Sequence, residues 1–214
     1  ASANPDVVEV DKHGVARAKG AGQAQVSAKV AGLAAVVNVV VDHFDRPAPV
    51  HFGHEVIAAF TRSGCNSGAC HGTPSGKNGF RLSLQGYLPD QDHAVLTREV
   101  FSRRVDRLSP DSSLILMKGS ARIPHEGGRR FGPDQEAYQV VRQWIAEGAN
   151  PVPADGPHLE RLEVLPKVRV LRNDARNQQI VVVAHFSDGS SRDVTPLITF
   201  TTSDPAVADV SKGG

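Results

Sequence analysis

The stretch Cys65-Asn66-Ser67-Gly68-Ala69-Cys70-His71 decides how the rest of the chain is interpreted. It contains both cysteines of the 214-residue chain, and a histidine directly follows the second. Apolar residues between positions 52 and 60 precede it at the i, i+4, i+7 and i+8 spacing of one helix face. Between His71 and Pro89 the chain is rich in Gly, Ser, Asn and Pro, which predicts an ordered loop. A helix ended by Gly64 therefore leads into the cysteines, and a loop leads away from them.

Two cysteines followed by a histidine are the attachment pattern of c-type haem, in which two thioethers hold the vinyl groups and the histidine is the proximal iron ligand. The usual spacing is C-x-x-C-H, whereas this chain has C-x₄-C-H. The inserted residues are small enough to bulge between fixed sulfur positions. We therefore expect one covalent haem c on Cys65 and Cys70, with His71 as proximal ligand. A Cys65–Cys70 disulfide, a zinc site and idle thiols remain as alternatives.

Two residues before the last predicted helix are candidates for the distal iron ligand. Met117, the single methionine, ends a short apolar helix and would give the His/Met pair that raises the reduction potential. His125 follows a stiffening proline and precedes two glycines that permit close passage beside a ring. We prefer His125, because a helical methionine more often packs in a core. Arg129 and Arg130 follow this loop, where they either pair with a haem propionate or form a solvated basic loop.

The segment 44–150 shows helical spacing in several further places. Helices are predicted from Asp90 to Val105, from Ser109 to Met117 and from Asp134 to Glu147. We therefore expect 44–150 to be an all-α haem domain. A proline-rich stretch, 151–157, is predicted to be a linker.

Residues 50–150 resemble the cytochrome c-like domains of large exported planctomycete proteins. The resemblance rests on Cys65 to Gly72, Ser112 to Lys118, Pro124 to Phe131, Tyr138, and Trp144 to Ala149. It implies a class I cytochrome c-like fold, in which the first and last helices pack across each other. The family also has a histidine in its Pro-His-x-Gly-Gly stretch, which implies the distal role for His125.

Both ends of the chain have β patterns. Residues 23–30 alternate at period two, residues 34–41 are rich in β-branched side chains, and 179–186 form a further predicted strand before a hairpin turn at 187–190. A repeat links the two ends at an offset of 200, because Pro5, Val7, Val10, Lys12 and Gly14 recur as Pro205, Val207, Val210, Lys212 and Gly214. This repeat predicts tandem β-domains on either side of the helical domain.

The two ends resemble the immunoglobulin-like domains of bacterial cell-surface proteins. The resemblance rests on Asn4 to Val10, on Phe186 to Ser190 and on Ser203 to Ala208. It implies that 1–43 is the second half of one such domain and 158–214 the first half of another, with a spacer or adhesive role. We expect the halves to pair as one sandwich, either within a chain or between the chains of a swapped dimer.

Net charge and hydropathy argue against two classes of function. A net charge of +1 argues against a nucleic-acid partner, and no apolar run is long enough for a membrane span. Because a haem with two protein ligands has no open position for a substrate, we expect one-electron transfer with a redox partner protein rather than an enzyme. Thioether attachment and secreted-type flanks predict export to the periplasm or cell envelope. The alternatives are an adhesive surface module with a disulfide-stapled insert, and a haem sensor or peroxidase-like domain with a labile sixth ligand.

Overall fold

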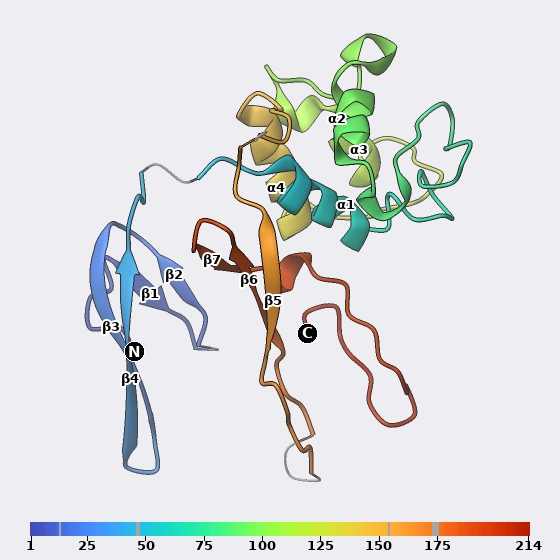
Figure 1. The fold of residues 1–214 in the computed structure, drawn as a ribbon. Coiled ribbons are helices and arrows are strands. Elements are labelled where there is room, and N and C mark those ends of the chain that lie inside the picture. The colour runs from blue at the N-terminus through green and yellow to red at the C-terminus, as the bar shows by residue number, and fades with distance from the viewer. Residues whose placement is uncertain (13, 46–47, 154, 173–175) are drawn as a thin grey trace. The chain divides into compact units, whose positions relative to one another are not determined.

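The computed structural model describes residues 1–12, 14–45, 48–153, 155–172 and 176–214. The chain forms two compact units, residues 1–49 and residues 50–214 (Figure 1). The predicted helical segment and the predicted C-terminal β segment therefore lie in the same unit. Ala154 of the predicted linker lies outside the described residues.

The first unit is built from two antiparallel strand pairs. β1 (Val8–Val10) pairs with β2 (Ala16–Ala18), and β3 (Gly22–Val30) pairs with β4 (Leu33–Val41). The β3–β4 hairpin turns at residues 31 and 32, whose φ angles of 49° and 80° suit a two-residue turn between twisted strands. The strands predicted at 23–30 and 34–41 are confirmed.

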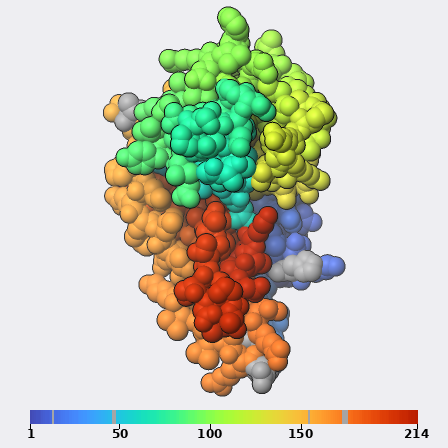
Figure 2. All heavy atoms as spheres, turned by 90° about the vertical axis from the view of Figure 1, so that its right-hand side faces the viewer, coloured from blue at the N-terminus to red at the C-terminus, as the bar shows by residue number. Residues whose placement is uncertain are grey.

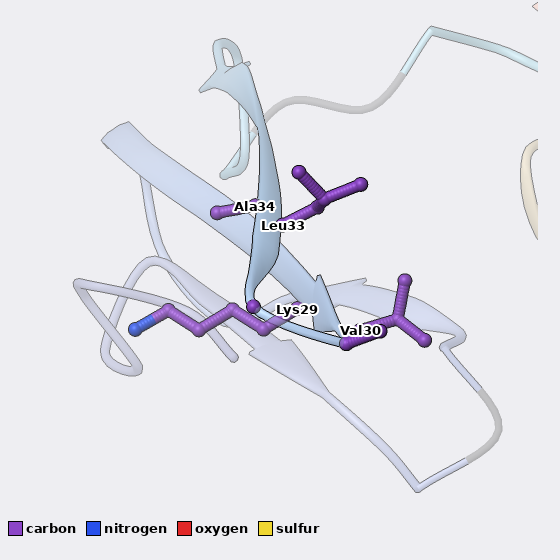
Figure 3. A pocket seen from close by; sticks show the side chains of 6 residues that line it. Lys29, Val30, Leu33 and Ala34 are labelled. Atoms are coloured by element: carbon purple, nitrogen blue, oxygen red, sulfur yellow. The ribbon is translucent and has the colours of Figure 1, made fainter.

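The first unit has a small core and a large exposed apolar face. Val7, Val8 and Ala24 are its buried apolar residues. Five apolar side chains of the hairpin are more than half exposed: Val30, Leu33, Val36, Val37 and Val40. A hollow at the tip of this hairpin is lined by residues 29–34, with Lys29 as its one charged side chain (Figure 3). All of its lining comes from one turn, so the hollow brings together no reactive groups.

The described part of the second unit contains four short α-helices around one core. They are α1 (Ile57–Arg62), α2 (Pro89–Thr97), α3 (Leu114–Gly119) and α4 (Glu136–Ala146). A π-helical turn, Phe52–Val56, leads into α1. The core centres on the fully buried Trp144 of α4, which packs on Phe52 at a ring-centroid distance of 5.0 Å. The helices predicted at 52–60 and 134–147 are confirmed.

The helix predicted from residue 90 to 105 ends early. α2 stops at Thr97, and Val100, Phe101 and Ser102 have φ angles of 50°, 55° and 57°. Three consecutive left-handed residues cannot continue a right-handed helix.

A three-stranded antiparallel sheet completes the second unit. Its order is β5 (Leu159–Leu165), β6 (Val181–Phe186) and β7 (Ser191–Asp193). Arg192 forms an ion pair with Glu55 at 3.1 Å, and Leu197 packs against the helical core. Arg62 of α1 donates to the carbonyl oxygens of Ile198 and Lys212. The sheet and the helices therefore share contacts along the π-helical turn and α1.

The predicted all-α cytochrome c-like fold between halves of one immunoglobulin-like sandwich is wrong. The structure is a mixed one, with 24% helix and 21% strand among the described residues. Most of the central segment is loop, because its glycines, prolines and left-handed residues keep the helices short. The strands form three separate small sheets, β1-β2, β3-β4 and β5-β6-β7, rather than one sandwich. No helix in the described part of the chain is long and apolar enough to span a membrane.

The repeat at an offset of 200 has a counterpart in the backbone. The carbonyl oxygen of Asn4 accepts from the N–H groups of residues 7 and 8, and that of Asp204 accepts from residues 207 and 208. The hydroxyl two residues earlier, of Ser2 or Thr202, accepts from the N–H of Asn4 or Asp204 at 3.2 Å in both copies. The two copies therefore share a turn, although each belongs to a different unit.

Candidate functional site

The end of α1 places the first cysteine. Gly64 has a φ of 72°, the N–H of Cys65 donates to the carbonyl oxygen of Phe60 at 2.9 Å, and the N–H of Gly64 donates to that of Thr61 at 3.0 Å. These two bonds form a Schellman motif, in which glycine takes the left-handed position. The predicted helix stop at Gly64 is confirmed, and it directs Cys65 into the core, where the residue is 7% exposed.

Backbone hydrogen bonds fold the residues between the cysteines into a compact bulge. The N–H of Cys70 donates to the carbonyl oxygen of Ser67, and the N–H of His71 donates to that of Cys65, both at 3.0 Å. The chain returns so close to Asn66 that a Cβ atom on Gly72 would lie 2.1 Å from the Asn66 carbonyl oxygen. The bulge contains the two residues by which C-x₄-C-H exceeds the usual C-x-x-C-H spacing. A hydrogen bond joins the backbones of Cys65 and His71 directly.

The two thiols are free and lie in different surroundings. Burial raises the pKa of Cys65 to about 12, although the nearby Arg130 guanidinium opposes the shift. Cys70 is half-buried, and its Sγ accepts a hydrogen bond from Nη2 of Arg130 at 3.3 Å. Arg130 thus connects the cysteine loop to the 123–130 loop.

The imidazole of His71 is held with one nitrogen free. Its Nδ1 lies 3.0 Å from the carbonyl oxygen of Phe80. A carbonyl only accepts, so Nδ1 has the proton and Nε2 keeps its lone pair. Burial lowers the pKa of His71, which favours the neutral ring that metals bind.

The imidazole of His125 is held in the same way. Its Nδ1 lies 2.8 Å from the carbonyl oxygen of Gly128, so Nδ1 donates to that oxygen. The His71 and His125 rings are nearly parallel, with an interplanar angle of 9° and centroids 6.3 Å apart. In Figure 2 the cyan to teal segment around the cysteines and the yellow segment around residue 130 lie side by side on one face.

The two remaining candidates are Met117 and Arg129. Met117 is half-buried in α3. Arg129 is exposed and lies 3.9 Å from Asp134. The roles given to these two residues stay predictions.

Three other histidines of the unit have structural contacts. His51 and His54 stack at the π-helical turn with ring centroids 3.8 Å apart. His93 is 7% exposed, and its Nε2 lies 2.9 Å from the carbonyl oxygen of Ala149. Its burial follows from packing between Phe52 and Trp144, which the local sequence of α2 does not reveal.

The sequence reasoning missed two residues that support His71. Phe80 supplies the carbonyl oxygen, and its ring lies 4.4 Å from the His71 ring. The Arg104 guanidinium lies 4.7 Å above the Phe80 ring. The dipeptide Asn78-Gly79 is a turn signal that could have located the turn, but no local pattern connects Arg104 with it.

No protein-family profile, curated protein or solved structure matches this chain. The class of the site therefore has to follow from its own geometry. A metal–imidazole nitrogen bond is about 2.0 Å long, so two imidazoles on opposite sides of one metal have ring centres about 6 Å apart. The observed centroid separation of 6.3 Å is of that size, and the two rings are nearly parallel and stacked. Both free cysteines lie in the same stretch of sequence as His71.

Proposed function

We propose that this chain binds one haem c, which Cys65 and Cys70 would attach and His71 and His125 would ligate, and that it serves in one-electron transfer. The observation that supports the proposal is the His71–His125 pair, with parallel rings 6.3 Å apart. The resemblance of the Cys65–Gly72 and Pro124–Phe131 stretches to exported cytochrome c-like domains agrees with it. That resemblance concerns the motifs and not the fold, which is mixed.

Four residues of the chain would hold the group, two through sulfur and two through nitrogen. The Cys65 and Cys70 sulfurs would bond to its vinyl carbons, and Nε2 of each histidine would face the iron. When bound, haem supplies a single-electron redox couple. The carbonyl oxygens of Phe80 and Gly128 keep the two imidazoles oriented, which makes them stronger donors. Two protein ligands leave no position for a substrate, so the role is electron exchange with a partner protein rather than catalysis.

The compartment and the partner follow from the same chemistry. Attachment of haem c takes place on exported chains, so we place this protein in the periplasm or cell envelope. Its partner would be another redox protein.

Covalent attachment can be tested by mass and spectrum together. We expect the chain, exported by a host that matures c-type cytochromes, to show a c-type pyridine haemochrome α-band and a mass raised by one haem. The Cys65→Ser/Cys70→Ser double variant should lose both signals, and a C-x-x-C-H cytochrome made in parallel controls for the host. A colourless wild-type chain two hydrogens lighter would instead indicate a Cys65–Cys70 disulfide and an adhesive module.

Haem ligation can be tested independently of the host's attachment machinery. We expect hemin added to the colourless chain to give a six-coordinate low-spin spectrum, which His71→Ala and His125→Ala each abolish. Met117→Ala is the matched control and should leave the spectrum unchanged. Loss of the spectrum in Met117→Ala alone would assign the distal position to methionine. Tight binding of carbon monoxide by the wild-type protein would favour a sensor or peroxidase-like domain.

A further inference from the structure

Arg104 is a buried cation with few charges around it. Its side chain is 8% exposed, and among the described residues its one ion pair is with the half-exposed Glu99, at 3.4 Å. Nη1 donates to the carbonyl oxygen of Val95 at 2.6 Å and Nη2 donates to that of Gly79 at 3.0 Å. Burial of a guanidinium costs free energy unless its N–H donors have acceptors. The two carbonyl oxygens therefore offset the cost of burying Arg104 and hold its side chain in one orientation.

The contacts of Arg104 converge on the turn that orients His71. Lys77 and Phe80 close this turn with two backbone hydrogen bonds of 2.9 Å, and Asn78 and Gly79 occupy it with φ angles of 50° and 71°. Arg104 holds it at two points, through the Gly79 carbonyl oxygen and through the face of the Phe80 ring. The carbonyl oxygen of Phe80 then accepts from Nδ1 of His71.

We propose that Arg104 is a positioning residue, which fixes the 77–80 turn so that the Phe80 carbonyl oxygen holds His71 as its Nδ1–H tautomer. The importance of the free Nε2 for iron rests on the proposed haem function, whereas the tautomer itself does not. A lysine in place of Arg104 keeps the charge but lacks the planar fork that reaches two carbonyl oxygens and stacks on the ring. The Arg104→Lys variant therefore separates the effect of the positive charge from the effect of the guanidinium's contacts with the turn.

The test measures the His71 tautomer in the haem-free chain by nitrogen-15 NMR, above the pKa of the ring. We expect the wild type to be mostly Nδ1–H, and the ratio of Nδ1–H to Nε2–H to fall about fivefold in Arg104→Lys and Arg104→Met. Arg142→Met is the matched control, because Arg142 binds Asp111 at 2.9 Å, away from the turn. If the Arg104→Met variant does not fold, the tautomer ratio of the Arg104→Lys variant tests the proposal.

A second measurement uses the haem-loaded chain. Weakening the Phe80 hydrogen bond makes His71 a poorer donor, so Arg104→Lys should shift the reduction potential upward while Arg142→Met leaves it unchanged. An unchanged tautomer ratio in folded Arg104→Lys, or a wild type that is mostly Nε2–H, overturns the role of Arg104. A chain that passes the tautomer test but binds no haem would overturn the proposed function alone.

Discussion

At the scale of residues, two histidines from different loops are prepared in the same manner. Each donates Nδ1–H to a backbone carbonyl oxygen, of Phe80 or of Gly128. The same backbone contact therefore orients both imidazoles, although they come from different loops.

Gly72 allows the close return of the chain beside the cysteine bulge. In Gly72→Ala the new Cβ would lie 2.1 Å from a backbone oxygen that cannot move independently. We expect this variant to lose about 2 kcal/mol of unfolding free energy, measured by urea denaturation. Gly68→Ala in the same loop is the matched control, because its Cβ would meet only the Leu84 side chain, at 3.8 Å. A Gly72→Ala chain as stable as Gly68→Ala would contradict the close approach.

The two thiols should react at very different rates in the haem-free chain. Burial raises the pKa of Cys65 to about 12, so at pH 8 only about 1 in 10⁴ molecules has a Cys65 thiolate. Cys70 is half-buried, so the alkylating reagent can reach it. We expect iodoacetamide at pH 8 to label Cys70 first, as measured by peptide mass mapping. Both cysteines should react in urea, and equal rates in the folded chain would refute the burial of Cys65.

The sequence identified the cysteines, His71 and His125 as candidates because their chemistry is local to short motifs. It did not identify Phe80 or Arg104, because their contribution depends on a contact between segments that are distant along the chain. It left a haem propionate and a solvated basic loop open for Arg130, and it did not foresee the contact of the guanidinium with the sulfur of Cys70. Residue types reveal which groups can react, but not which neighbours orient them.

At the scale of elements, the π-helical turn before α1 joins the helical core to the sheet. His54 stacks on His51 and lies 5.3 Å from the ring of Phe186 in β6, while Glu55 pairs with Arg192 of β7. Burial, together with His51, Arg192 and His158, lowers the pKa of His54 to about 4. His54 is therefore neutral in the folded chain near pH 7, and it binds a proton more readily when the chain unfolds.

The depressed pKa of His54 makes the stability of the second unit depend on pH. Between pH 6.5 and pH 4 the unfolded state binds more protons at this residue, so stability falls as the pH falls through that window. After allowance for solvent screening, we expect the wild type to lose about 1 kcal/mol more than His54→Gln between pH 7 and pH 5. Urea denaturation at both pH values measures the difference.

His43→Gln provides the control for this effect, because His43 is exposed and belongs to the first unit. It should show the pH dependence of the wild type. Identical pH dependence in the wild type and His54→Gln would mean that the contact at the π-helical turn does not exclude a charged imidazole.

Elements with a strong local pattern were predictable, and their arrangement was not. The alternation in β3 and the glycine that ends α1 were both recognised from the sequence. The helix predicted through residue 105 was too long, because the left-handed residues after α2 contain valine and phenylalanine, which give no turn signal. The assumption that helices in this order must form an all-α domain gave the wrong fold class.

At the scale of the whole molecule, the two units differ greatly in how much apolar surface they bury. The buried core of the second unit includes Trp144, Phe52, Phe60 and Phe131. The buried core of the first unit has three small residues, Val7, Val8 and Ala24. Two-stranded pairs with so little buried area are marginally stable.

The amides of the two units should therefore exchange hydrogen at different rates. The free energy of local opening ranges from near zero up to the free energy of global unfolding. A tenfold difference in exchange rate corresponds to a difference of about 1.4 kcal/mol in opening free energy. Because β3 and β4 present exposed valines over most of their length, we expect their amides to exchange at least about tenfold faster than those of α4. Mass spectrometry of peptides from β3–β4 and from α4 measures this ratio, with the urea-unfolded chain as the fully exchanging reference. Equal protection in both units would show that they unfold as one cooperative structure, and the candidate site would then depend on the stability of residues 1–49 as well as on its own core.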